Sequence, residues 1–307
     1  MLVNVFDSLL RPPLRSVNVP LILSISSAWL PVVLDATYLF PNNRTLAIGL
    51  PALLGTGMQC IGGGVTLPIY WLISLLVRLA TREKSGTMRR PDKFAVIGAV
   101  LGIILGTIPI TIAMVVKPTQ LIITLWQPMP LYCSAIQIAV VCLLSKGTSD
   151  AATGMVSIAT DRKLYTMTQL AYAICALVVV PGHIFYVRAI VHSETPLEEL
   201  ADTLLPYPYV YSYRSMEDLF IFGPANEVKR FLQWDSTFIV VSTWLGGAWP
   251  WAFSGILNFL QAITTSVAGA ILLGPGALMV MPHMIHAWKD EKARIKRQGV
   301  VADKKAQ

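Results

Sequence analysis

The chain has few charged residues for its length. Of its 307 residues, 13% are charged and 54% are hydrophobic, whereas about a quarter of the residues in a soluble domain are charged. A water-soluble protein of this size needs a charged surface, and this composition cannot supply one. We therefore expect an integral membrane protein.

Several sequence motifs are also missing, and each absence excludes a class of chemistry. There is no DDxxD pair of aspartates and no NDxxDxxxD run, so Mg²⁺-dependent ionisation of a diphosphate would have no ligands. No P-loop, GxSxG or HExxH motif occurs, which removes the corresponding nucleotide-binding, hydrolase and zinc-site interpretations. His283 and His286 have a spacing that can bind metal, but no third ligand accompanies them. We expect neither a metal nor any other cofactor.

Long uncharged intervals define the expected membrane spans. Residues 94–116 contain no ionisable side chain, and residues 236–288 contain only two histidines. Runs of about 20 apolar residues predict transmembrane helices, because only a helix satisfies its own backbone in hydrocarbon. We predict an all-α, polytopic transmembrane helical bundle of seven or eight spans, forming a single domain over residues 1–307. The expected spans are 19–40, a long stretch over 46–77, 94–116, 120–144, 165–190 and two or three spans within 236–288.

Glycine and proline clusters mark where these apolar stretches should bend or break. Gly62-Gly63-Gly64 and Pro68 interrupt the stretch 46–77, which predicts either a kinked helix or a broken pair of half-helices. Gly246-Gly247 and Gly274-Pro275-Gly276 divide the last apolar stretch in the same way.

The positive charges predict the orientation of the chain. The net charge is +7, and the basic residues crowd two places beside apolar spans, as the positive-inside rule expects of cytoplasmic segments. These clusters are Arg78, Arg82, Lys84, Arg89, Arg90 and Lys93, read as one short loop, and Lys289, Lys292, Arg294, Lys296, Arg297, Lys304 and Lys305 in the tail. We therefore expect the lipid bilayer, and not nucleic acid, as the partner. An even number of crossings between the clusters favours eight spans over seven.

Three segments are expected outside the spans. Residues 1–18 form an interfacial lead-in, residues 192–233 a polar loop and residues 289–307 a basic cytosolic tail. The expected localisation is a multi-pass position in the endoplasmic reticulum membrane. With eight spans, the Asn43-Arg44-Thr45 sequon faces the lumen, which makes Asn43 a candidate glycosylation site close to the membrane.

Two aspartates are the candidate catalytic residues. A carboxylate at the centre of a membrane helix costs about 2.5–3.5 kcal/mol and is therefore a functional candidate. Asp35 lies within the first expected span with Tyr38 on the same helical face, although it could instead cap the turn that follows. Asp235 is flanked by Trp234 and Phe238, although an aspartate before an apolar run is also an ordinary helix N-cap.

Other polar and aromatic residues could bind a substrate or join helices. Tyr38, His183, Trp234 and Trp244 are the substrate-binding candidates; His183 could equally be an interhelical histidine. Three glutamines within apolar segments are expected to hold helices together. They are Gln59, Gln127 and Gln137. Glu217, Asp218 and Glu227 occupy the polar segment and are expected to be solvated.

Three short segments carry a resemblance to a known family. Residues 41–49 (PNNRTLAIG), 62–70 (GGGVTLPIY) and 231–235 (FLQWD), with a histidine late in the fifth span, resemble the membrane-bound fungal meroterpenoid cyclases of the ascofuranone, ascochlorin and macrophorin type. The resemblance implies cyclisation of a farnesyl chain on an aromatic or epoxyquinone head. It also implies that the reaction starts by protonating a terminal alkene or epoxide, without ionisation of a diphosphate. A prenylated aromatic or epoxyquinone small molecule is then the expected partner.

Two other classes of protein remain open from the residues alone. A transporter or channel could use half-helices around Gly62-Gly63-Gly64 and Gly246-Gly247. That class predicts paired short segments in two related halves of the chain, which the sequence does not show. A non-catalytic scaffold within a membrane pathway is the third class.

Overall fold

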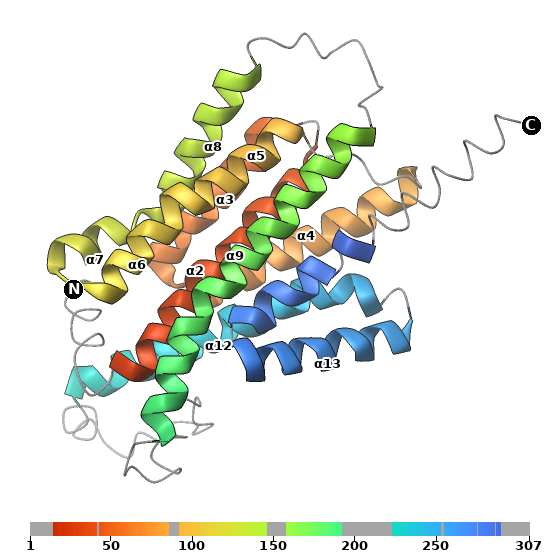
Figure 1. Cartoon of the computed structure of the whole chain (residues 1–307). Coiled ribbons are helices and arrows are strands. Elements are labelled where there is room, and N and C mark those ends of the chain that lie inside the picture. Colours follow the sequence, from red (N-terminus) through yellow and green to blue (C-terminus); the bar gives the residue numbers. More distant parts are fainter. Residues whose placement is uncertain are drawn as a thin grey trace, which may run out of the picture.

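The regular secondary structure of the described residues is entirely helical, which confirms the predicted all-α class (Figure 1). The computed structural model describes residues 15–41, 43–85, 92–145, 158–191, 223–252, 255–274, 276–285 and 287–289. The elements are α2 (Arg15–Leu39), α3 (Arg44–Ile61), α4 (Gly63–Ser85), α5 (Lys93–Leu101), the π-helical segment η1 (Gly102–Thr107), α6 (Ile108–Val116), α7 (Gln120–Trp126), α8 (Met129–Ser145), α9 (Ile158–Val191), α12 (Gly223–Ala252) and α13 (Ile256–Leu273). Residues 276–285 are also helical.

Several helices have the length and composition to cross a membrane. Four stretches of the described chain qualify, namely Gly63–Ala80, Lys93–Val116, Lys163–Pro181 and Ile256–Leu273. A fifth is added if α7 and α8 count as one span. The count of seven or eight spans therefore stays a prediction.

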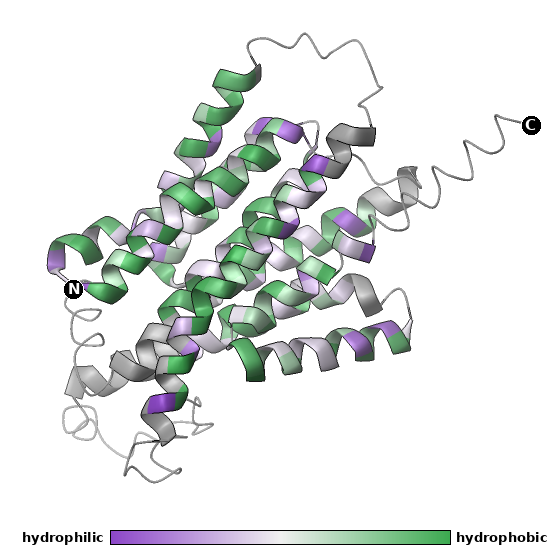
Figure 2. Ribbon diagram, in the orientation of Figure 1, coloured by the Kyte–Doolittle hydropathy of each residue, from purple (hydrophilic) through white to green (hydrophobic). Residues whose placement is uncertain are grey.

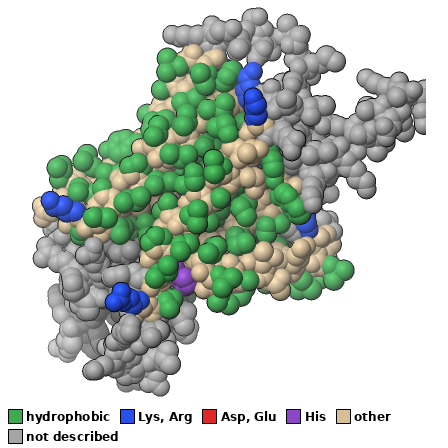
Figure 3. Space-filling model, viewed as in Figure 1, with side chains coloured by type: hydrophobic (Ala, Val, Ile, Leu, Met, Phe, Trp, Pro, Cys, Tyr) green, Lys and Arg blue, Asp and Glu red, His purple; other side chains and the backbone are tan. Residues whose placement is uncertain are grey.

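The outer surface of the bundle is apolar, as a lipid-facing surface should be. Hydrophobic side chains cover most of the described surface on the face in view, and the few Lys and Arg side chains lie near its margins (Figure 3). Hydrophobic residues also follow the helices along most of their length (Figure 2). Leu53, Leu143 and Leu257 are among the exposed side chains, at 70%, 72% and 79% exposure. Such exposure is consistent with a hydrocarbon environment.

Helix α2 is the central element of the bundle. It packs against α3, α4, α5, α6, α9 and α12, and Figure 1 shows α9 alongside it. Its residues 28–37 are buried throughout. A helix that is apolar on every side belongs in the interior, so Asp35 on α2 is placed inside the bundle and not against lipid.

Small residues allow α5 and η1 to lie very close to α8. A Cβ atom on Gly98 would fall 2.9 Å from the Gln137 carbonyl oxygen, and one on Gly102 would fall 2.6 Å from the Cys133 carbonyl oxygen. Glycines spaced four residues apart permit such close helix crossings in membranes. The Gln137 side-chain amide also donates to the Ala95 carbonyl oxygen at 2.9 Å, which confirms its predicted interhelical role.

The structure confirms some of the predicted breaks and corrects others. Gly62, with φ 95°, separates α3 from α4, so the stretch 46–77 is a broken pair. Gly274, with φ 100°, ends α13 as expected. The predicted break at Gly246-Gly247 is wrong because α12 runs through both glycines, and the chain turns at Gly255 instead. A Cβ on Gly246 would lie 2.3 Å from the Trp71 ring, so this glycine serves helix packing.

Two further boundaries differ from expectation. The expected single span 120–144 is two helices bent by 53°, because Pro128 and Pro130 supply no N–H donors at the junction. Helix α12 begins at Gly223, so the last part of the expected polar loop 192–233 is helical. Residues 192–222, with Glu217 and Asp218, lie outside the described residues, as do most of the lead-in and the basic tail.

Candidate functional site

Asp35 is the centre of a buried polar cluster between α2 and α4. The Tyr70 hydroxyl and the Ser74 hydroxyl donate to Asp35 Oδ2 at 2.9 and 2.7 Å, and Arg78 Nη2 forms an ion pair with Oδ1. The three partners follow one another at intervals of four residues on α4, so they lie on one helix face. We refer to Asp35, Tyr70, Ser74 and Arg78 as the Asp35 cluster.

The cluster satisfies both oxygens of a carboxylate that is only 7% exposed. A buried charge is tolerated when it is paired and hydrogen-bonded, and Arg78 supplies the opposite charge. The alternative interpretation of Asp35, a cap near the turn at Pro41, does not describe these contacts. The basic cluster suggested that Arg78 lies in a loop. This is wrong, because α4 continues to Ser85 and Arg78 lies within it. The signal in the sequence for this cluster was the spacing of four residues between Tyr70, Ser74 and Arg78, which places them on one helix face.

Aromatic residues extend the Asp35 cluster toward α12 and the last helical segment. The Tyr70 and Trp71 rings meet edge to face with centroids 5.0 Å apart, and Trp71 also contacts the His283 ring at 5.0 Å. His283 Nε2 lies 3.1 Å from the Thr243 carbonyl oxygen. His283 is thus a packing and hydrogen-bonding residue. In the part of the chain that the structure describes, no group of three potential metal ligands occurs.

Two backbone N–H groups bind the Asp235 carboxylate. The Gly64 N–H donates to Oδ1 at 2.6 Å, and the Gly63 N–H donates to Oδ2 at 3.3 Å. These N–H groups are free to do so because Gly62 ends α3 and leaves the first turn of α4 without intrahelical partners. A Cβ on Gly64 would lie 2.8 Å from the Asp235 Cα, so only glycine permits this approach.

Asp235 is therefore a cap, but of a different helix from the one expected. It lies well inside α12, which begins at Gly223, so its interpretation as the N-cap of its own apolar run is wrong. Its carboxylate instead caps α4, where the helix dipole favours negative charge. Among the described residues, no Lys or Arg forms an ion pair with it.

The predicted substrate-binding residues do not converge on one cavity. Tyr38 is half-buried one turn beyond Asp35. His183 Nε2 lies 2.9 Å from the Ile271 carbonyl oxygen. This contact joins α9 to α13, so it agrees with the alternative interpretation of His183 as an interhelical histidine. Trp234 is 42% exposed and stacks on Phe238 at 5.7 Å. The indole N–H of Trp244 is buried and has no acceptor within the described chain.

Asn43, the candidate glycosylation site, is exposed and caps α3. Its side-chain oxygen accepts from the Leu46 N–H at 3.0 Å. Its glycosylation stays a prediction.

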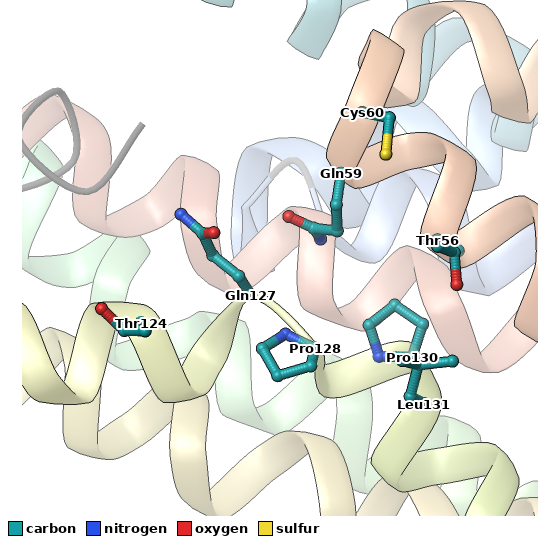
Figure 4. A pocket seen from close by; sticks show the side chains of 9 residues that line it. Thr56, Gln59, Cys60, Thr124, Gln127, Pro128, Pro130 and Leu131 are labelled. Atoms are coloured by element: carbon teal, nitrogen blue, oxygen red, sulfur yellow. The ribbon is translucent and has the colours of Figure 1, made fainter. Parts of the chain in front are cut away.

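A pocket that the sequence did not reveal lies between α3 and the junction of α7 with α8 (Figure 4). Its volume is about 250 Å³. It is lined by Gly55, Thr56, Gln59, Cys60, Thr124, Gln127, Pro128, Pro130 and Leu131. Gln59 and Gln127, which were expected to join helices, instead form part of its wall.

Comparison with known proteins identifies the family. The family model described as the CtvD domain matches residues 1–285. Neither the curated proteins nor the solved structures contain a match. The CtvD family is fungal and related to the meroterpenoid cyclases, which agrees with the broad class indicated by the resemblance. Because the match covers almost the whole sequence, this protein belongs to the CtvD domain family.

Proposed function

We propose that this protein is a membrane-bound cyclase that closes rings on the farnesyl chain of a prenylated aromatic or epoxyquinone. It would act as a multi-pass protein of the endoplasmic reticulum membrane. Family membership supports a fungal cyclase-like enzyme of secondary metabolism. The observation that carries the proposed proton transfer is the Asp235 carboxyl group, partly buried and held by two backbone N–H groups.

The contacts of the two aspartates favour Asp235 over Asp35 as the initiating acid. Asp35 is paired with Arg78, and a carboxylate that neutralises a guanidinium has no proton to give. Asp235 is bound only by N–H groups within the described chain. When a protonated Asp235 gives up its proton, a negative charge remains on its carboxylate. The Gly63 and Gly64 N–H groups and the α4 dipole stabilise this charge. The same contacts therefore stabilise the product of the transfer.

The proposed reaction conserves the atoms of the substrate. The Asp235 carboxylic acid gives its proton to the oxygen of an epoxide or to a carbon of the terminal alkene. The C–O bond or the π bond breaks, and neighbouring alkenes attack the carbocation to form rings. Loss of a proton from carbon ends the sequence and leaves an isomer of the substrate. No redox partner or diphosphate is required.

An aromatic side chain also lies at the α4–α12 interface. Trp71 lies two turns after Gly64 on α4 and is buried against α12, where its indole N–H donates to the Thr243 hydroxyl at 3.4 Å. Aromatic faces stabilise cations, and exclusion of water protects them from capture. Trp234, although adjacent to Asp235, is 42% exposed on the outer surface and does not contribute to this proposal.

The proposal is tested by expression in a yeast host fed a farnesylated phenol epoxide. We expect a product of unchanged mass and different retention, formed by the wild type and lost in Asp235→Asn. Turnover in isolated membranes should persist with excess EDTA. Loss of turnover in EDTA with recovery on adding Mg²⁺ would contradict direct protonation.

One observation argues against a transporter. In transporters with broken helices, the N-terminus of a half-helix faces the substrate. Here the N-terminus of α4 is already occupied by Asp235 of the same chain. Uptake of the unchanged substrate into vesicles, without an isomer, would nevertheless favour transport; absence of both would favour a scaffold.

A further inference from the structure

The pocket between α3 and the α7–α8 junction has an uncharged wall that is mostly apolar and carries a few polar side chains. None of its nine lining residues is Asp, Glu, Lys, Arg or His. The polar side chains are two amides, Gln59 and Gln127, and two hydroxyl groups, Thr56 and Thr124. An ion would find no counter-charge here, so the wall suits a neutral and mostly apolar ligand that carries a few hydrogen-bonding oxygens.

Gln127 lines the pocket, but its amide nitrogen is turned away from the accessible space. Its amide nitrogen is shielded from water and has no acceptor among the described residues. Figure 4 shows the Gln59 side chain, from α3, and the Gln127 side chain, which follows α7, among the residues that line the pocket. Rotation about the last side-chain bond of a glutamine is nearly free, so either end of this amide can be presented to a ligand. A buried donor without an acceptor is unfavourable, and after this rotation a ligand oxygen in the pocket would satisfy it.

The size of the pocket limits what it can hold. At about 250 Å³ it exceeds a cavity of about 150 Å³ that binds benzene, but is smaller than the roughly 300–1,000 Å³ of pockets for drug-sized ligands. A substituted aromatic ring or a quinone fits this range, whereas a ring with a farnesyl chain does not. The farnesyl chain of such a substrate would therefore extend out of the pocket.

The pocket is close to the proposed acid. Cys60, on its wall, is three residues before Gly63, and three residues span at most about 11 Å. Gly63 N lies 3.3 Å from Asp235 Oδ2. An extended farnesyl chain is comparable in length with the sum of these distances, so a head in the pocket and a chain end at Asp235 are compatible.

We propose that this pocket binds the neutral, oxygen-bearing head of the prenylated substrate, with Gln127 and Gln59 as hydrogen-bonding residues. The identity of the ligand rests on the proposed cyclase function, but its binding can be measured without turnover. The head would be held by the amides, while the chain extends along the break between α3 and α4 toward Asp235.

The test is the binding of 2-farnesylphenol and farnesylbenzene to the full chain in lipid nanodiscs. The two probes differ only in the hydroxyl group, so their affinity ratio measures the polar contact. We expect the wild type to prefer the phenol, and we expect Gln127→Leu to weaken phenol binding about 5-fold to 10-fold, the scale of one net hydrogen bond. Farnesylbenzene affinity should be unchanged in the variant, which would also show that it is folded.

Gln120→Leu is the matched control, because Gln120 begins the short helix α7 that Gln127 follows, is exposed and does not line the pocket. It should leave both affinities unchanged. Gln59→Leu repeats the test from α3 if Gln127→Leu does not fold. Equal losses for both probes, or no change in the phenol-to-benzene ratio in either lining variant, would overturn the proposed head-group site.

The binding test separates this inference from the cyclase proposal. Preferential phenol binding that depends on Gln127, without formation of an isomer, would retain the site and reject the cyclase. Isomer formation with an unchanged KM in Gln127→Leu and Gln59→Leu would retain the cyclase and reject the site.

Discussion

Asp35 and Asp235 are both aspartates on long helices of an apolar bundle, yet their surroundings differ in kind. Asp35 lies in the interior, 7% exposed, with Arg78 and two hydroxyl groups as partners. Asp235 lies where α12 crosses the start of α4 and is bound by two backbone N–H groups. One carboxylate is matched by a full positive charge, and the other by the partial charge of a helix end.

This difference separates a structural role from a chemical one. The ion pair joins α2 to α4, and removing Arg78 would leave Asp35 as an uncompensated buried charge. A carboxyl group held by N–H donors leaves a charge when it loses its proton, but those donors and the helix dipole stabilise that charge. We therefore assign the Asp35 cluster to stability and Asp235 to proton transfer, and the following substitutions test that assignment.

The largest expected effect is on turnover in Asp235→Asn. Asparagine keeps an oxygen for the Gly64 N–H but has no proton to transfer, so activity per molecule should fall about 10²–10⁴-fold while the protein remains in the membrane. The measurement is isomer formed per unit of immunodetected protein. Asp35→Asn should instead lower the amount of folded protein. Loss of turnover in Asp35→Asn at normal abundance, with loss of folded protein in Asp235→Asn, would reverse the roles assigned to the two aspartates.

Arg78→Leu should cause the largest loss of stability. It leaves Asp35, whose side chain is 5% exposed, without its counter-charge, and breaking a buried pair costs about 3–5 kcal/mol. Thermal unfolding in detergent measures the effect. The double variant Asp35→Asn/Arg78→Leu should recover part of the loss because no buried charge remains.

Arg44→Leu is the control for this prediction. Arg44 pairs with Asp92 but its side chain is 47% exposed, and exposed pairs contribute about 0–1 kcal/mol. Equal losses for Arg44→Leu and Arg78→Leu would argue against a special role for the buried pair.

Gly64→Ala should give an intermediate effect at the Asp235 end. The added Cβ would meet the Asp235 Cα at 2.8 Å and its Oδ1 at 2.9 Å, so the helices must separate. Overpacking of this kind costs about 1–3 kcal/mol, and displacement of the carboxyl group should also reduce turnover. Gly49→Ala, where a Cβ meets nothing within 4 Å, should be neutral or slightly stabilising. Wild-type activity in Gly64→Ala would show that the position of Asp235 is unimportant.

The smallest effect is expected for Trp234→Leu. This side chain is 42% exposed and contacts Phe238 on the outer surface, so replacing it by another apolar residue should change stability by less than about 0.5 kcal/mol. Turnover should also be retained. A large loss of activity with normal abundance would restore Trp234 as a substrate-binding residue and extend the proposed site to the outer face.

The sequence by itself determined the features that depend on local properties of the chain. The uncharged run 94–116 corresponds to the helical stretch Lys93–Val116, and the predicted span 19–40 overlaps the helix α2, of which Ile25–Leu39 is a shorter apolar helix. The glycine cluster at 62–64 correctly marked a break. Apolar length and backbone conformation are properties of a short stretch, so they can be read without knowing what packs nearby.

Only the tertiary structure decided which polar groups meet. Arg78 looked like one more residue of a basic cluster, and Gly246 looked like a break, until Asp35 and Trp71 were seen beside them. Asp235 was recognised as an acid or a cap, but the helix that it caps begins at Gly63, far away in sequence. The pocket at Gln59 and Gln127 likewise arises from the meeting of α3 with a helix junction. Such pairings depend on how whole helices cross, and that is set by side-chain packing across the bundle, which no local pattern records.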